Sequence, residues 1–263
     1  MSRKDVTLGR ILKSGLVPVY IHDSLDVVRL AEAAIAAGVH AVEVSCRRPD
    51  VVQVVKRLRS EFPDLAVGVA SLIEEGAYFD FLQQRGPRFP SIAEAVDAGA
   101  DFLVSALPFN KETYDRFPDL PIIPGVHSMS EAKTQLDFGA SLVKFGNVDG
   151  PRAAAINCGP IHLGFPMLVT GGVRPEHVGP LVAAKVLVCV AGFELILRPH
   201  YLALQKALEG DVVRACVGEY ITAFAAARRS HQPHVDFASG DPRLIQEQTG
   251  QFLNIRPDRT LKP

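Results

Sequence analysis

The chain has 263 residues, of which 48% are hydrophobic and 22% are charged, and its formal net charge is −1. This composition permits a large buried core and excludes a mostly disordered chain. The balanced charge also gives no sign of a basic surface, so we expect no nucleic-acid and no membrane partner.

Four cysteines lie far apart in the sequence, without the close Cys and His spacing of typical metal sites: Cys46, Cys158, Cys189 and Cys216. We therefore expect reduced cysteines in a cytoplasmic protein. No apolar run reaches the roughly 20 residues that a membrane-spanning helix needs, and the amino-terminal residues lack a signal-type apolar stretch.

After an amphipathic helix near residues 8–14, eight apolar runs alternate with stretches of helical spacing. The predicted strands cover residues 16–21, 41–45, 66–71, 102–107, 121–126, 142–145, 167–170 and 186–190. This order is typical of an α/β protein with a (β/α)8 TIM barrel. An open doubly wound sheet is the second possibility, although His22-Asp23-Ser24 follows the first strand where that fold has a glycine-rich turn.

Two regions interrupt the alternation. Residues 74–90 form an insertion after the third strand that is rich in aromatic residues, and it reads either as a lid over the barrel mouth or as an extra surface helix. After a last helix near residues 211–229 comes a polar tail. We expect a barrel domain over residues 1–230 and a carboxy-terminal extension over residues 231–263, as an extended arm or a partly disordered segment that could pack on a neighbouring subunit.

Lys144 lies inside the predicted sixth strand, among apolar residues. An ammonium group loses several kcal/mol of hydration when it is buried, so burial lowers the pKa of a lysine. A neutral amine near pH 7 is a nucleophile that can form a Schiff base with a ketone. The alternative is that Lys144 lies at a strand end and extends its ammonium group to solvent.

The second predicted strand places Glu43, Ser45 and Arg47 on one face, because side chains alternate along a strand. Charged residues are almost never buried unpaired, so such a face is unusual for an inert core. Glu43 could move protons while Arg47 binds a substrate carboxylate. The alternative is a structural ion pair of Glu43 with Arg47 or Lys144.

Because active sites of TIM barrels lie at the carboxyl ends of the strands, further candidates for substrate binding come from those ends. They are Ser71, Ser105, Pro124, Thr170, Gly171, Gly172, Gly192 and Phe193. Adjacent glycines let backbone N–H groups approach an anion, although the pair Gly171-Gly172 could equally serve a tight turn.

These motifs together resemble the 2-keto-3-deoxy-6-phosphogluconate / 4-hydroxy-2-oxoglutarate aldolase family of class I aldolases. The resemblance extends over residues 8–200 and rests on Leu16-Val17-Pro18-Val19, Val42-Glu43-Val44-Ser45-Cys46-Arg47, Phe102-Leu103-Val104-Ser105, Ile123-Pro124-Gly125-Val126, Val143-Lys144-Phe145 and Thr170-Gly171-Gly172-Val173. It implies a (β/α)8 barrel, usually a homotrimer, that cleaves a 4-hydroxy-2-oxo acid into pyruvate and an aldehyde without a metal or another cofactor.

The same resemblance implies a role for individual residues. Lys144 takes the position of the Schiff-base lysine and Glu43 that of the general acid and base. Arg47 and Ser71 fall where the pyruvate carboxylate is held, although a threonine is more usual at the second position. Thr170, Gly171 and Gly172 fall where the far end of the substrate binds.

The chain departs from the family pattern near the substrate. The family usually has Phe-Pro-Ala after the lysine and Gly-Gly-Ser after the eighth strand, where this chain has Phe145-Gly146-Asn147 and Ala191-Gly192-Phe193. A phenylalanine cannot donate a hydrogen bond to phosphate and would fill space in that cradle. The third-strand motif Gly-x-Gly-Thr is changed to Gly68-Val69-Ala70-Ser71.

The sequence therefore predicts a class I aldolase that cleaves or forms a 4-hydroxy-2-oxo acid, with an aldehyde half smaller or less anionic than glyceraldehyde 3-phosphate. One alternative is another lysine-iminium lyase, a dehydratase or decarboxylase of a 2-oxo acid. A second is a barrel that binds a metabolite or a partner without catalysis.

Overall fold

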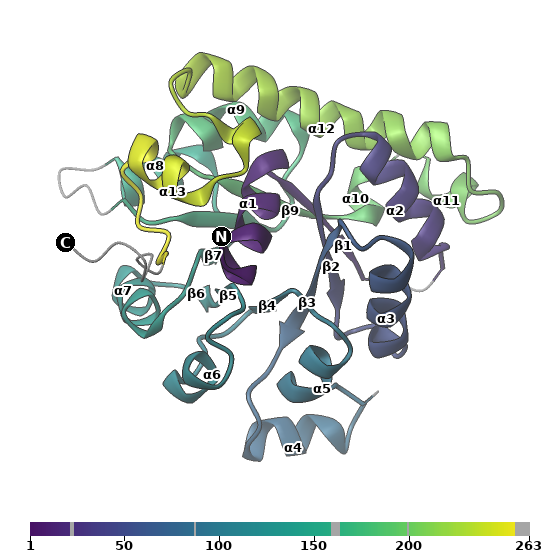
Figure 1. Ribbon diagram of the computed structural model, residues 1–263. Helices are drawn as coiled ribbons and strands as arrows, with labels where there is room; N and C mark the ends of the chain where they lie inside the picture. Colours follow the sequence, from purple (N-terminus) through teal and green to yellow (C-terminus); the bar gives the residue numbers. More distant parts are fainter. Residues whose placement is uncertain (22–23, 87, 159–163, 199, 256–263) are drawn as a thin grey trace.

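The computed structural model of the protein describes residues 1–21, 24–86, 88–158, 164–198 and 200–255. Its strands form one parallel sheet in the order β5-β4-β3-β2-β1-β9-β8-β7-β6 (Figure 1). The strands are β1 (Leu16–Tyr20), β2 (Ala41–Ser45), β3 (Ala66–Leu72), β4 (Phe102–Ser105), β5 (Ile122–Ile123), β6 (Gly125–Val126), β7 (Val143–Gly146), β8 (Met167–Thr170) and β9 (Val188–Gly192).

The sheet closes at Pro124, which alone separates β5 from β6. Ile122 pairs with β4 on one side, while Gly125 pairs with Lys144 of β7 on the other. The Pro124 carbonyl accepts the Lys144 backbone N–H at 2.8 Å, and proline itself has no N–H to offer the sheet. β5 and β6 are thus two halves of one strand, and the ring has eight strand positions. The predicted (β/α)8 barrel is confirmed.

The helices are α1 (Arg3–Ser14), α2 (Val27–Ala36), α3 (Val51–Glu61), α4 (Ala77–Gln83), α5 (Ile92–Asp97), α6 (Lys111–Arg116), α7 (Met129–Phe138), α8 (Gly150–Asn157), α9 (Pro175–Ala183), α10 (Phe193–Ile196), α11 (Tyr201–Leu204), α12 (Gly210–His231) and α13 (Pro242–Thr249), with a 3-10 helix η1 (Phe237–Ser239). Side-chain oxygens of Ser91 and Ser128 accept backbone N–H groups at the starts of α5 and α7, which fixes where these helices begin. No helix in the described part of the chain is long and apolar enough to cross a membrane.

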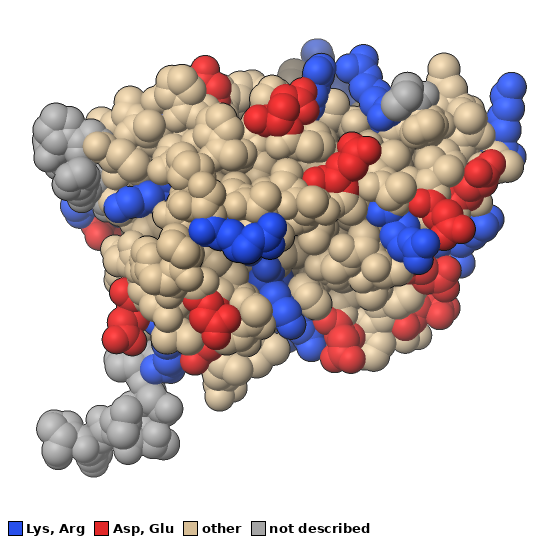
Figure 2. All heavy atoms as spheres, turned by 90° about the horizontal axis from the view of Figure 1, so that it is seen from above, with Lys and Arg blue, Asp and Glu red and all other residues tan. Residues whose placement is uncertain are grey.

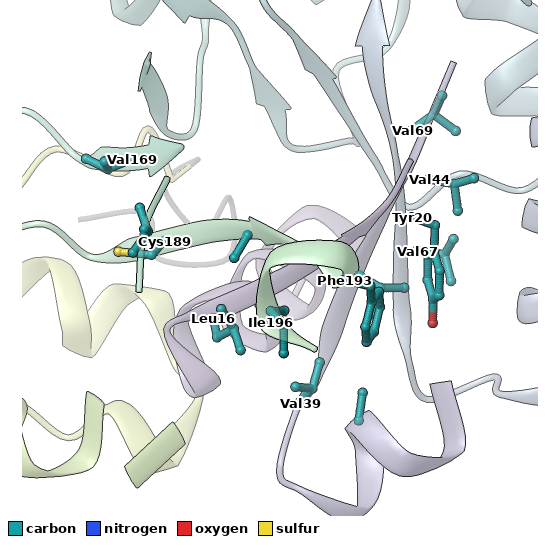
Figure 3. Packing of buried hydrophobic residues seen from close by; sticks show 14 of the residues in the cluster. Leu16, Tyr20, Val39, Val44, Val67, Val69, Val169, Cys189, Phe193 and Ile196 are labelled. Carbon is teal, nitrogen blue, oxygen red and sulfur yellow. The ribbon is translucent and has the colours of Figure 1, made fainter. Parts of the chain in front are cut away.

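The apolar residues divide into two layers because side chains alternate along each strand. Val42 and Val44 of β2 belong to the outer core between the strands and the helices, which Figure 3 shows from close by. Ala41 belongs to a second core inside the barrel. On the face shown in Figure 2, acidic and basic residues are interspersed.

The insertion after β3 carries α4, which has no buried residue. Tyr78 and Phe81 are exposed on it. Before α4, the carboxylate of Glu74 accepts hydrogen bonds from the Asn110 backbone N–H at 2.9 Å and the Thr113 hydroxyl at 2.7 Å, so the loop is tied to the start of α6. These features favour an extra surface helix over a lid.

The carboxy-terminal extension differs from the expected arm. Through residue 255 it folds onto the amino-terminal end of the barrel, where η1 and α13 contact α1 (Figure 1). Phe237, Ile245 and Leu253 join the inner core together with Leu12 of α1. The apolar residues of an otherwise polar segment explain the difference, since burying them on α1 stabilises a folded conformation. Residues 256–263, and His22 and Asp23 of the first predicted loop, lie outside the described residues.

Close backbone contact and one arginine hold this covering segment in place. A Cβ atom on Gly9 would lie 1.9 Å from the Gly240 carbonyl oxygen, so α1 and the segment can meet only if residue 9 is glycine. Arg228 of α12 donates to the Leu12 and Lys13 carbonyls at 2.8 Å each and lies 3.7 Å from the centre of the Phe237 ring. The guanidinium therefore joins the end of α1 to η1.

Candidate active site

Glu43 is a buried carboxyl group inside the barrel. Val42 and Val44 on either side of it belong to the outer core, so its own side chain points to the interior. It is 2% exposed, and within the described residues its Oε1 atom has no hydrogen-bond partner. Burial raises the pKa of Glu43 to about 7, although the positive charge of Lys144 acts in the opposite direction. A carboxyl group in this state exchanges protons near neutral pH.

Lys144 extends into the same interior from β7, between Val143 and Phe145, which both belong to the outer core. Its side chain is half-buried, so solvent still reaches it. Burial lowers the pKa of Lys144; the charge of Glu43 raises it and that of Arg47 lowers it further. The structure favours a desolvated amine over a lysine that extends fully into solvent.

The strand order brings Glu43 and Lys144 together. With β5 and β6 counted as one strand, three strands separate β2 from β7 in either direction around the ring. The two strands are therefore opposite each other, and their inward side chains meet across the narrow interior. No ion pair with an N–O distance under 4.0 Å involves Glu43 within the described ranges, which speaks against a purely structural pair.

Arg47, Ser45 and Ser71 form a connected group beside this pair. The Ser45 hydroxyl lies 3.2 Å from the backbone nitrogen of Arg47, 3.2 Å from its Nε and 3.2 Å from the Ser71 hydroxyl. Ser71 has a φ angle of +63°, which is rare for a residue other than glycine, and it lies within the register shift between Val69 and Leu72. The irregular backbone turns the Ser71 hydroxyl toward β2.

Thr170, Gly171 and Gly172 lie at the end of β8, beside Asn147 from the end of β7. The Asn147 backbone N–H donates to the Thr170 carbonyl at 2.8 Å. Gly171 has a φ angle of +95°, and a Cβ atom there would lie 2.3 Å from the Asn147 Oδ1 atom. The sequence analysis names Asn147 only within the departure from the family pattern after Lys144 and gives it no role.

These loops border a cavity of about 420 Å³ at the rim of the barrel. It is lined by Asn147, Val148, Asp149, Gly150, Pro151, Gly171, Gly172, Val173, Glu176, His177, Pro180 and Leu181. Asp149 and Glu176 bring two carboxylates to this lining. Glu176 is paired with the guanidinium of Arg174, with Oε1 3.8 Å from Nη1, and Asp149 accepts the Arg152 backbone N–H at 2.9 Å.

Four other predicted residues are placed differently. Pro124 is buried at the strand break described above. The Ser105 hydroxyl is buried away from the interior, where it donates to the Leu72 carbonyl at 2.7 Å and accepts the Leu107 N–H at 2.9 Å. It secures backbone and does not join the group around Lys144.

The end of β9 also corrects an expectation. The ring of Phe193 does not fill the predicted phosphate cradle; it packs against Tyr20 in the outer core, with ring centres 4.8 Å apart (Figure 3). Gly192 ends the strand, and a Cβ atom on it would lie 2.8 Å from the Glu194 Oε2 atom. A carboxylate therefore lies beside Gly192, which the family resemblance puts in the phosphate cradle.

Among the described residues, no group of three or more His, Cys, Asp and Glu side chains is arranged to hold a metal ion. The described residues of the site bring together an amine of lowered pKa, a carboxyl group with a pKa of about 7 and a guanidinium next to two hydroxyls.

Comparison with known proteins gives a consistent match. The family model described as KDPG and KHG aldolase matches residues 9–201. The KHG/KDPG aldolase of Escherichia coli K12 is 28% identical over 194 residues, which cover 71% of this chain and 83% of that protein. A 2-dehydro-3-deoxy-phosphogluconate aldolase of Dickeya dadantii is 29% identical over 198 residues, covering 71% and 84%.

A solved structure shares the fold. It is the KDPG aldolase of Legionella pneumophila with pyruvate captured as a covalent carbinolamine intermediate. The superposition has a TM-score of 0.60 at 23% sequence identity and covers 80% of this chain and 96% of the other.

Proposed function

The chain belongs to the KDPG and KHG aldolase family, and from that premise we propose that it is a class I aldolase acting on a 4-hydroxy-2-oxo acid. Lys144 forms the imine and Glu43 moves the protons. The observation that carries this proposal is the half-buried amine of Lys144 opposite a fully buried carboxyl group that has no hydrogen-bond partner at Oε1 within the described residues.

The reaction begins when neutral Lys144 attacks the C2 carbonyl carbon of the 2-oxo acid. The carbinolamine takes up a proton from solvent, its hydroxyl group leaves as water, and the resulting iminium withdraws electrons from C3. Ionised Glu43 removes the proton of the C4 hydroxyl, the C3–C4 bond breaks, and its electron pair forms an enamine while the aldehyde leaves. Protonated Glu43 then returns the proton to C3, and water releases pyruvate and Lys144.

The raised pKa of Glu43 suits both steps. A carboxyl group with a pKa of about 7 is present in its basic and acidic forms at neutral pH, so one residue serves as base and then as acid. The lowered pKa of Lys144 increases the fraction of the amine that is able to attack.

The carboxylate of the 2-oxo acid binds to Arg47 and Ser71. Arg47 is exposed at the mouth, and its charge acts on Lys144, so a carboxylate held there lies within reach of the amine. Binding the carboxylate before reaction orients C2 toward Lys144.

The aldehyde half is uncharged or cationic and carries no phosphate. Asp149 lines the rim cavity next to Gly171 and Gly172, and no lysine or arginine of the described residues is paired with its carboxylate, whereas Glu176 is paired with Arg174. Carboxylates raise the free energy of a nearby phosphate, whereas they accept hydrogen bonds from hydroxyl or ammonium groups. A hydroxylated neutral aldehyde or an amino aldehyde fits this lining.

Reductive trapping tests the proposal. The protein is incubated with pyruvate and sodium borohydride, and its intact mass is measured beside Lys144→Ala and beside Lys185→Ala, which removes an exposed lysine at the end of α9. A pyruvate-derived mass gain that requires Lys144 and is kept in Lys185→Ala supports the imine. Absence of an adduct with pyruvate and other small 2-oxo acids contradicts it and favours a binding protein.

Product analysis then separates the reaction types. Release of pyruvate and an aldehyde from a 4-hydroxy-2-oxo acid supports the aldolase, whereas loss of water or carbon dioxide supports a dehydratase or decarboxylase. The homotrimer and the cytoplasmic location stay predictions, which light scattering of the purified protein and cell fractionation test.

A further inference from the structure

Ser45 occupies a central place in the hydrogen bonds beside the reacting lysine. It is fully buried at the end of β2, and its hydroxyl oxygen lies 3.2 Å from three polar atoms: the backbone N and the Nε of Arg47, and the Oγ of Ser71. Water does not reach this hydroxyl, so these three contacts define its bonding.

The direction of each hydrogen bond follows from counting hydrogens. A hydroxyl has one hydrogen and accepts two hydrogen bonds, while the N–H groups of Arg47 can only donate. Both acceptor positions of Ser45 are therefore taken by Arg47. Its one hydrogen is left for Ser71, and Ser71 cannot donate in return.

The count leaves Ser71 with its own hydrogen available. Within the described residues the Ser71 hydroxyl has no further hydrogen-bond partner. The Nη atoms of Arg47 likewise carry hydrogens that no described residue accepts, since its hydrogen bonds run only through the backbone nitrogen and Nε. The open side of the group thus presents donors alone.

We propose that Ser45 is a positioning residue that fixes the orientation of these donors, so that Arg47 and Ser71 present a purely donating pair to the carboxylate of the 2-oxo acid. This inference rests on the proposed function. An ionised carboxylate only accepts hydrogen bonds, so a hydroxyl turned the other way would meet it with a lone pair. Fixing the direction in advance avoids that repulsion and the loss of side-chain freedom on binding.

A structural role for Ser45 makes a different prediction. If its hydroxyl only satisfied the Arg47 backbone N–H where β2 ends, its removal would lower stability and would weaken all ligands alike. If it orients donors for an anion, its removal weakens ligands that carry a carboxylate and spares those that do not.

The experiment measures the ligand concentration that gives half-maximal trapping with sodium cyanoborohydride, for pyruvate and for its neutral methyl ester. The proteins are the wild type, Ser45→Ala, Ser45→Thr, Ser71→Ala and the double variant Ser45→Ala/Ser71→Ala, with melting temperatures as a check on folding. We expect Ser45→Ala to raise the concentration for half-maximal trapping roughly tenfold for pyruvate and less than about twofold for methyl pyruvate. Ser45→Thr keeps the hydroxyl and restores the pyruvate value.

The double variant tests whether Ser45 acts through Ser71. Because Ser45 acts partly through Ser71, Ser45→Ala has a smaller effect on pyruvate in the Ser71→Ala background than in the wild type. Equal effects on pyruvate and its ester, strictly additive effects, or an unchanged pyruvate value in Ser45→Ala would each overturn the inference while the aldolase proposal stands. A wild type that forms no adduct with either ligand would overturn both.

Discussion

Glu43 and Lys144 oppose each other across the barrel interior, and each shifts the protonation of the other against the effect of burial. Burial raises the pKa of Glu43 and lowers that of Lys144, while the attraction between their charges acts in the reverse sense on both. Burial is the larger effect for each. The net effect favours a neutral amine at Lys144 and a proton on Glu43 more than either free group would, and both shifts suit imine chemistry.

Replacing Glu43 with glutamine separates imine formation from proton transfer. Glu43→Gln keeps the shape of the side chain and leaves Lys144 in place, so the pyruvate adduct still forms after borohydride treatment. Turnover falls by roughly 10²–10⁴-fold because the general acid and base is lost. Glu112→Gln, on the exposed start of α6, serves as the control. Unchanged turnover in Glu43→Gln would remove Glu43 from the mechanism.

The same variant changes how stability depends on pH. The pKa of Glu43 is about 7 in the folded protein against 4.5 for the ordinary group. The folded state thus binds more protons than the unfolded state between these values, and its stability falls as the pH rises from 4.5 to 7. Glutamine does not titrate. Glu43→Gln should therefore gain stability over the wild type by up to about 3 kcal/mol from pH 4.5 to pH 8.

Urea unfolding at pH 5 and pH 8 measures this difference, as long as both proteins unfold in a single transition. A stability difference between the variant and the wild type that is the same at both pH values would mean that Glu43 is ionised in the folded protein at pH 5.

Two residues with a φ angle of +63° separate stability from function. Lys185 is exposed just after α9, and Ser71 lies beside Arg47. Glycine adopts this conformation without the steric penalty of a side chain, so Lys185→Gly should raise the free energy of unfolding by about 1 kcal/mol. In Ser71→Gly the buried Ser45 hydroxyl loses its acceptor, which offsets this gain. Only Ser71→Gly should weaken pyruvate trapping. Weakened trapping in both variants, or in neither, would contradict the role given to Ser71.

Truncation of Phe237 tests the floor of the barrel, by which we mean α1 together with η1 and α13, which contact it. Phe237→Ala removes a buried ring and its contact with the Arg228 guanidinium, so we expect a loss of about 3 kcal/mol of stability. The pyruvate concentration for half-maximal trapping at low temperature should not change, because Lys144 faces the other end of the barrel. An equal loss of stability in Phe252→Ala, which truncates a ring that is 52% exposed in the same carboxy-terminal segment, would show that the effect does not depend on the buried contacts of Phe237.

The features that the sequence predicted depend on residues that are close together in the chain. Strand alternation alone placed Glu43, Ser45 and Arg47 on one face, and the apolar surroundings of Lys144 marked it as buried. Alternation also puts Ser105 on the opposite face of β4 from Phe102 and Val104. The structure shows that these two residues belong to the inner core, so Ser105 points outward.

Other features depend on contacts between distant segments and could not be predicted. The left-handed turn at Asn147 is fixed by the Thr170 carbonyl of the next strand. The folding of the last segment depends on the apolar face of α1, which Phe237 and Ile245 cover. No local sequence pattern in either segment indicates which distant residues it contacts.

The floor of the barrel also has a consequence for how the protein is made. Leu12 emerges from the ribosome early, whereas Phe237 and Ile245, which cover it, emerge after every strand and every residue of the candidate site. A nascent chain that already contains Glu43 and Lys144 still exposes the apolar face of α1. Completion of the fold therefore waits for α13, and translation that stops before it leaves a full set of active-site residues in a barrel whose α1 is not covered by η1 and α13.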